Sequence, residues 1–406
     1  MRDPVFCPAT SGGYGIVRLG SDVPESHLLM VTSNACGRHV SISSIQAGYR
    51  NRITFYIIEE TKIFLGGIED EIVEAAEAII REKRPRLLIV YLSCSTYMAG
   101  VDDDRLRKIL QRVDAGVEIQ IIDMNPVAAG TPNPPGVMAQ EKIYELLDLN
   151  CEKSRSVNLI GCDVPPLSSE LYEILKGLGF EHVNHLTTCT TYDEFLGMGG
   201  AELNIVMSAK AIRAANEMSP SIPYVMMFTD YSLKGIDDSY SSLYDKVGRT
   251  FSLSVYRERT LKKLKAVKEE LSGMTIAVGS SATEHPFMLA EALLGYGFAV
   301  KAVFYTEVGK KDSEAKNRIS TEHPDVDFFR CSKLSMASMV GRCGQYDLAI
   351  GNNAGYFSDT RAIADIVLDQ GMFGYDGLYR LLDEMVKALR QPIPLKQLVM
   401  NANLVI

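Results

Sequence analysis

The sequence has no run of the ~18–20 apolar residues that a membrane-spanning helix needs, and its eight cysteines include no CxxC pair. The opening MRDPVFCPAT lacks a charged segment followed by an apolar run, so we expect no secretory signal. These absences favour a cytoplasmic protein without a membrane anchor. Disulfides are uncommon in that compartment, so the cysteines are either buried thiols or ligands.

An excess of positive charge is also missing, because the 406 residues carry a formal net charge of -9. A nucleic-acid-binding surface needs clustered Lys and Arg, so we expect no nucleic-acid partner. No Gly-x-x-x-x-Gly-Lys-Ser/Thr loop occurs, so the chain should not bind ATP itself. Hydrophobic residues make up 46% and charged residues 23%, which is ordinary for globular domains.

Short apolar runs alternate with amphipathic helical stretches along the chain. Continuous apolar runs of strand length, separated by helices such as Glu69–Lys83, are typical of parallel sheets covered on both faces. The pattern therefore predicts doubly wound α/β domains. The expected strands are His27–Thr32, Leu87–Ser93, Ile119–Asp123, Val157–Ile160, Leu203–Met207, Tyr224–Phe228, Thr275–Val278, Ala299–Phe304 and Asp347–Ile350.

An internal repeat supports more than one such domain. The segment VNLIGCDVPPLSSELYEILKGLGF (157–180) resembles MTIAVGSSATEHPFMLAEALLGYGF (274–298), and each has the form of a strand, a Pro-containing loop and a helix. We therefore predict three Rossmann-like domains around a central cleft, with boundaries at 1–155, 156–268 and 269–406.

Three cysteines are candidate ligands, and at least two of them occupy positions where ligands bind in such folds. Cys36 and Cys94 follow predicted strands, and Cys7 precedes a glycine-rich stretch. Ligands of open α/β sheets bind outside the carboxyl ends of strands, and thiolates are the usual ligands of iron–sulfur clusters. A cysteine at a strand end is more often a buried apolar residue, and three ligands are one short of four. A cluster here would be completed by another chain or by a non-cysteine group.

The order of several motifs resembles that of the nitrogenase component 1 family. These motifs are FCPATSGGYG, NACGRHVS, EETKIFLGGIEDEI and LSCSTYMAGVDDDRL, followed by TTYDEFLGMGGAELNIV, DLAIGNNAGYF and GMFGYDGLYRLLDEM. The resemblance covers nearly the whole chain. It implies that Cys7, Cys36 and Cys94 hold a four-iron or eight-iron cluster at a subunit interface. The implied partners are a homologous subunit, in a homodimer or as the α-type half of a heterotetramer, and an ATP-dependent iron protein.

Two positions depart from the catalytic subunit of nitrogenase itself. In the resemblance, Ser208 stands where that subunit has a cofactor-binding Cys, and Phe373 stands where it has a cofactor-binding His. Neither side chain can replace them, so dinitrogen reduction by this chain alone is not expected. The wording of the later motifs leans towards the β-type subunits. The chain is then expected to be a nitrogenase-like oxidoreductase component that relays electrons to a substrate or to a partner-held cofactor.

Other residues carry weaker expectations. His39 is expected to be a polar neighbour of the cluster. Asp102 and Asp103 are either a solvated helix start or have a role near iron-protein docking or in orienting the cluster. Cys189 and His285 are candidates for contact with a substrate. Two other functions stay open: a scaffold that assembles or carries a metallocluster, and a small-molecule binding protein or transferase built on the same fold.

Overall fold

The computed structural model describes Phe6, Pro8 and residues 15–113, 116–125, 133–161 and 165–401. Its strands form three sheets in which all pairings are parallel. The predicted α/β class with three parallel sheets is confirmed. None of the helices in the described part of the chain is both long and apolar enough to cross a membrane.

The first two sheets share one strand order, and the third has five strands in a related order. The first has the order β2-β1-β3-β4, the second β6-β5-β7-β8 and the third β11-β10-β9-β12-β13. In the first two sheets the first strand in the chain lies between the second and the third, and in the third sheet β9 lies between β10 and β12; each sheet is therefore doubly wound, with a topological switch point beside its first strand. The strands are β1 Ser26–Thr32, β2 Ile53–Ile57, β3 Leu87–Leu92, β4 Glu118–Asp123, β5 Ser156–Ile160, β6 His182–Asn184, β7 Leu203–Val206, β8 Tyr224–Met226, β9 Thr275–Gly279, β10 Ala299–Tyr305, β11 Asp327–Arg330, β12 Leu348–Ile350 and β13 Ile363–Ala364.

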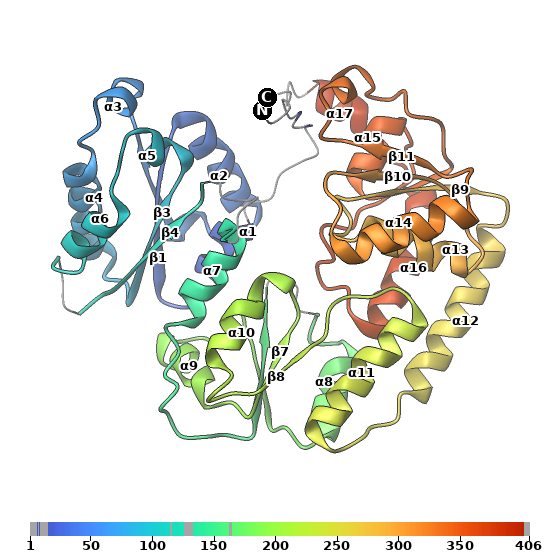
Figure 1. The fold of residues 1–406 in the computed structure, drawn as a ribbon, viewed down its shortest axis with the longest axis horizontal. Coiled ribbons are helices and arrows are strands. Elements are labelled where there is room, and N and C mark those ends of the chain that lie inside the picture. Colours follow the sequence, from blue (N-terminus) through green and yellow to red (C-terminus); the bar gives the residue numbers. More distant parts are fainter. Residues whose placement is uncertain are drawn as a thin grey trace. The chain divides into compact units, whose positions relative to one another are not determined.

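Helices follow most strands and cover the sheets, as Figure 1 shows. They are α1 Gly15–Asp22, α2 Asn34–Gln46, α3 Glu60–Leu65, α4 Glu69–Lys83, α5 Cys94–Met98, α6 Asp103–Leu110, α7 Pro135–Tyr144, α8 Glu170–Gly177, α9 Tyr192–Gly197, α10 Ile212–Met218, α11 Leu233–Val247, α12 Ser254–Glu270, α13 Pro286–Gly295, α14 Lys310–Glu322, α15 Asn352–Ser358, α16 Gly374–Arg390 and α17 Leu395–Asn401.

The chain divides into two compact units. The two-sheet unit comprises Gly13–Cys162 and Gly179–Met226 and contains the first and second sheets. The one-sheet unit comprises Met1–Gly12, Asp163–Leu178 and Met227–Ile406 and contains the third sheet. Each of the three predicted domains contains one of the sheets, and the boundaries between those domains stay a prediction.

The two central strands of the first sheet are buried on both faces. All residues of β1 and β3 are buried, and their apolar side chains pack with those of α4 and α6 in one core that includes Leu29, Val90, Ile72 and Leu106. Burying each such side chain contributes about 1.5–3 kcal/mol. This core fixes the carboxyl ends of β1 and β3, which carry two of the predicted ligands.

Candidate functional site

Cys36 and Cys94 follow two neighbouring strands of the first sheet. In the pairing of β1 with β3, Val31 lies opposite Leu92, so the two strands end at the same edge. Cys36 is the third residue of α2 and Cys94 is the first residue of α5. Because the switch point of this sheet lies between β1 and β3, the cysteines flank the position where open α/β sheets bind ligands.

Both cysteines lie in the first turn of a helix. Ser33 and Ser93 are the N-cap residues, and the Ser93 hydroxyl accepts a hydrogen bond from the Ser95 amide at 3.3 Å. Amide N–H groups without helical partners and the positive end of the helix dipole stabilise negative charge there. A thiolate is the form of cysteine that binds metal, so this placement suits a ligand.

A glycine allows α2 to approach the sheet beside Cys36. A Cβ atom on Gly37 would come within 2.6 Å of Ile57 Cδ1 and within 3.3 Å of Thr32 Cγ2. A larger residue would therefore require the Ile57 side chain to move and would crowd Thr32 beside Cys36. The Thr32 hydroxyl is itself buried and has no hydrogen-bond partner among the described residues.

Exposed apolar side chains lie on the two helices that carry the cysteines and on the neighbouring helix α3. Cys36 and Cys94 are partly exposed, and neither is disulfide-bonded to another described residue. The helices α2, α3 and α5 lie at one end of the first sheet (Figure 1), and α3 packs against α5. We call their exposed side chains, with that of Ile57, the apolar edge. The apolar edge consists of Ile42, Ile45, Ile57, Phe64, Leu65, Tyr97 and Met98.

The apolar edge is unusual in its concentration. Phe64 is 86% exposed and Leu65 is 84% exposed on the six-residue helix α3. Seven of the thirteen exposed large hydrophobic side chains in the described part of the chain belong to this edge. Scattered exposed apolar residues need no explanation, but a concentration of them indicates an interaction surface.

The third predicted ligand, Cys7, lies outside the described residues. Within the residues that the structure describes, no group of three or more His, Cys, Asp or Glu side chains could hold a metal ion. The structure therefore brings Cys36 and Cys94 to one edge of one sheet and leaves the place of Cys7 as a prediction.

The acidic residues after Cys94 have a local structural role. Asp102 is the N-cap residue of α6 and accepts a hydrogen bond from the Arg105 amide at 3.0 Å. Burial, with a smaller contribution from Asp123, raises the pKa of Asp103 above its ordinary value. These contacts fit the helix-start interpretation of Asp102. His39 lies on α2, one turn after Cys36, and is partly exposed.

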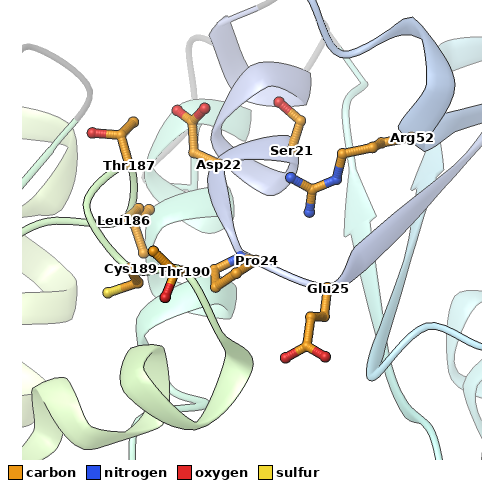
Figure 2. Close-up of a pocket in the computed structure, with 9 residues that line it drawn as sticks. All are labelled: Ser21, Asp22, Pro24, Glu25, Arg52, Leu186, Thr187, Cys189 and Thr190. Atoms are coloured by element: carbon orange, nitrogen blue, oxygen red, sulfur yellow. The ribbon is translucent and has the colours of Figure 1, made fainter.

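Cys189 and His285 lie in different units. Cys189 follows β6 and lines a pocket of the two-sheet unit (Figure 2), where burial raises the pKa of its thiol to about 11. His285 is the N-cap residue of α13 in the one-sheet unit, and its buried Nδ1 has no hydrogen-bond partner among the described residues. The nearby Asp312 accepts hydrogen bonds from the amides of Phe287 and Met288 at 3.2 and 3.1 Å.

Ser208 and Phe373 both have structural environments. The Ser208 hydroxyl accepts a hydrogen bond from the Lys210 amide at 3.3 Å at the start of a short 3₁₀ turn. Phe373 is 2% exposed, and its ring meets the ring of Tyr240 edge-on at 6.0 Å. Neither side chain is a thiolate or an imidazole, so neither can be the metal ligand that the resemblance places at these positions.

Sequence reasoning missed one buried carboxylate. Glu170 Oε1 accepts hydrogen bonds from Tyr375 N at 2.6 Å and from Tyr240 Oη at 3.0 Å, and Oε2 accepts one from Asp376 N at 3.1 Å. The Asp376 carboxylate in turn accepts a hydrogen bond from Glu170 N at 2.7 Å. Each acid thus caps the helix that carries the other, and together they fix the turn after Phe373. No local pattern around residue 170 announces a partner about 200 residues later.

Three doubly wound parallel sheets, with cysteines at helix starts beside one switch point, define a multidomain Rossmann-like protein with a candidate thiolate site. The family model for nitrogenase component 1 type oxidoreductases matches residues 14–390, and the chain belongs to that family. The resemblance inferred from the motifs is therefore confirmed.

The similar proteins agree with this assignment. The chain is 27% identical over 301 residues to the nitrogenase iron-molybdenum cofactor biosynthesis protein NifE of Clostridium pasteurianum. That match covers 70% of this chain and 64% of the relative, which is less than two thirds of its length. The solved structure "Nitrogenase Cp1 at pH 6.5" aligns with a TM-score of 0.74 at 14% identity, over 96% of this chain and 94% of that one. A second, "Nitrogenase Cp1 at pH 5", aligns with a TM-score of 0.65 at 14% identity, over 94% and 88%. At that identity the structural likeness supports the fold alone.

Proposed function

We propose that this chain is the iron–sulfur-cluster-bearing subunit of a nitrogenase-like reductase. The observation that carries the proposal is the placement of Cys36 and Cys94 in the first turns of α2 and α5, across the switch point of the first sheet. With Cys7 they supply three thiolates, and the fourth ligand comes from outside this set. The cluster is of the four-iron or eight-iron type.

The residues around the cysteines fit such a group. The thiols are partly exposed, so a cluster can reach them, and the helix starts supply N–H groups for its charge. A buried hydroxyl without a partner usually has an acceptor that the described residues do not include, and a cluster sulfur would be one for Thr32. Hydrogen bonds to cluster sulfurs raise the reduction potential of iron–sulfur sites.

The apolar edge supports a cluster at a subunit interface. Covering it with a homologous subunit would remove apolar surface from water at about 25 cal/mol per Å². It would also exclude water from the cysteines. The partner is a second copy of this chain or an α-type relative, and an ATP-dependent iron protein supplies the electrons. When bound, the cluster accepts and passes on single electrons, while this chain positions it and shields it.

A scaffold role is the second candidate. It is favoured by the 27% identity to NifE, whose name describes cofactor biosynthesis. Ser208 and Phe373 suit either function, because neither side chain would anchor a second metal cofactor permanently in this chain. The two candidates share the cluster and differ in what leaves the protein, which is electrons in one case and metal in the other.

Anaerobic purification with iron and acid-labile sulfide analysis tests the proposal. The unaltered chain should contain both, and Cys36→Ala and Cys94→Ala should lose most of each. Cys151→Ala is a matched control, since Cys151 is also partly exposed in the two-sheet unit but lies outside the proposed ligand set. An iron-free wild-type protein, or cysteine variants with normal iron, would refute the cluster.

Loaded protein then separates reductase from scaffold. A reductase should oxidise the reduced iron protein in a reaction that hydrolyses ATP, and its iron content should stay constant. A scaffold should pass iron to an apo-acceptor protein without consuming reductant.

A further inference from the structure

A second site lies in the two-sheet unit, at the opposite end of β1 from the cysteines. It is a pocket of about 350 Å³ whose wall includes Asp22, Glu25 and Arg52 on one side and Thr187, Cys189 and Thr190 on the other (Figure 2). Asp22 and Glu25 precede β1, whereas Cys36 follows it. At about 3.3 Å per residue, this seven-residue strand separates the two sites by roughly 20 Å.

The first charged group that lines the pocket is the carboxylate of Asp22. Its side chain is 25% exposed, and its Oδ2 lies 4.0 Å from Nε of Arg18. Asp22 makes no hydrogen bond to any of the described residues. Burial raises the pKa of its carboxyl to about 6. A partly buried carboxylate is costly unless hydrogen-bond donors surround it, so Asp22 has unused capacity to accept hydrogen bonds.

The second charged group that lines the pocket is the guanidinium of Arg52. Its Nε and Nη2 donate to the carbonyl of Ser26, and Nη2 also donates to the Ser26 hydroxyl at 2.8 Å and to the Val23 carbonyl. Its Nη1 donates to none of the described residues. The positive charge of Arg52 lowers the pKa of Asp22, so the two side chains interact electrostatically. Within the described chain, however, they form no ion pair within 4.0 Å.

Glu25 ties together the two chain segments that form the pocket. It has a φ of +54°, a left-handed conformation that is uncommon for a residue other than glycine. Its Oε2 accepts a hydrogen bond from the Tyr192 amide at 2.7 Å, at the start of α9. This bond ties the segment before β1 to the segment after β6. Backbone strain of this kind costs about 1–3 kcal/mol and is concentrated at binding sites.

We propose that this pocket binds a small zwitterion of the α-amino acid class, with the ammonium at Asp22 and the carboxylate at Nη1 of Arg52. An anion alone would face the Asp22 carboxylate, and a cation alone would face the Arg52 guanidinium. A molecule that carries both charges can pair with the Asp22 carboxylate and with the Arg52 guanidinium at once. The volume lies at the small end of the roughly 300–1,000 Å³ of ligand pockets, which suits one amino acid.

In this proposal the side of the pocket lined by Thr187, Cys189 and Thr190 contacts the side chain of the bound amino acid. The hydroxyls of Thr187 and Thr190 are hydrogen-bonded to His185 Nδ1 and Glu194 Oε2, so the hydroxyl oxygens can only accept further hydrogen bonds. The Cys189 thiol stays protonated at neutral pH because burial raises its pKa to about 11. Cys189 is therefore a small, weakly polar contact here and not a nucleophile. The site is independent of the proposed iron–sulfur site, so the failure of either proposal leaves the other standing.

The unaltered 406-residue chain is tested by calorimetry and thermal denaturation against the twenty proteinogenic L-amino acids, each supplied singly. At least one should bind and raise the melting temperature, because a ligand at 100 times its Kd stabilises the folded state by about 2.7 kcal/mol. The N-acetyl and α-carboxamide derivatives of that amino acid should each bind at least tenfold more weakly. The proposal would be overturned if none of the twenty amino acids bound, or if either single-charge derivative bound with the same affinity as the amino acid itself.

A variant then locates the site. Asp22→Asn should lower the affinity at least tenfold with unchanged circular dichroism, since Arg52, which also holds Val23 and Ser26, is left intact. Asp245→Asn makes the same change on an exposed position of α11 in the other unit and should bind as the wild type does. Unchanged affinity in Asp22→Asn would place the amino acid elsewhere. The derivative comparison uses the unaltered chain, so it decides the charge requirement even where a variant misfolds.

Discussion

The buried carboxylate of Glu170 offers a quantitative test of how the turn after Phe373 is held. Glu170 is 2% exposed and caps α16 through the amides of Tyr375 and Asp376. In Glu170→Ala these amides and the fully buried hydroxyl of Tyr240 lose their acceptor. Each buried donor without a partner costs about 1–3 kcal/mol, and water can reach some of the space vacated. We therefore expect a loss of about 3–5 kcal/mol in the free energy of unfolding.

Glu170→Gln is the smaller perturbation. The amide oxygen can still accept the bonds from Tyr375 N and Tyr240 Oη, but the NH₂ group then faces the donors Asp376 N and Ser169 Oγ. We expect about half of the loss seen in the alanine variant, because one of the two oxygens is kept.

The assay is urea unfolding of the full chain followed by circular dichroism, with hydrogen exchange of the Tyr375 and Asp376 amides as the local readout. Faster exchange at these two amides should accompany the loss of stability. Glu269→Gln, on an exposed position of α12, is the control and should lie within about 0.5 kcal/mol of the wild type. A Glu170→Ala protein as stable as this control, with protected amides, would refute the capping argument.

Three further predictions concern other parts of the chain. Burial raises the pKa of Asp22 in the folded chain to about 6, against an ordinary 3.8, so the folded state is favoured by protonated Asp22 below about pH 4 and loses that stabilisation as the pH rises through about 6. In urea unfolding at pH 7, Asp22→Asn should therefore be more stable than the wild type by up to about 3 kcal/mol. Phe64→Glu should leave monomer stability unchanged and weaken subunit association at least tenfold in sedimentation, whereas Leu334→Glu, exposed in the other unit, should not. Gly374→Ala should lower the melting temperature markedly, because φ is +64° there and a Cβ would lie 2.1 Å from Glu170 Oε1; an unchanged melting temperature would contradict this geometry.

The sequence predicts every central strand and misses four of the six edge strands. All nine predicted strands are found, and α4 has the predicted bounds Glu69–Lys83. The four strands that were not predicted, β2, β6, β11 and β13, are each at an edge of a sheet. An edge strand has one neighbour and is less covered, so it needs no continuous apolar run. β6 has the residues HVN and is partly exposed throughout, and β13 has only two residues.

The candidate site is predictable only in part, for a physical reason. A cysteine at the end of a buried strand can be placed at the carboxyl edge of a parallel sheet from the sequence, as Cys36 and Cys94 were. The apolar edge could have been suspected from IFLGG in α3, whose Phe64 and Leu65 face solvent. The pocket at Asp22 and Arg52 brings together segments about 160 residues apart in the chain, and local periodicity carries no information about such pairings.

The most direct test of the central claim is the iron anomalous density in crystals of the assembled complex grown without oxygen. The account predicts iron next to the sulfur atoms of Cys36 and Cys94, at the edge of the first sheet, with a second protein chain covering Phe64 and Leu65. Iron elsewhere in the chain, or a complex whose Cys36 and Cys94 sulfurs contact protein atoms only, would contradict it.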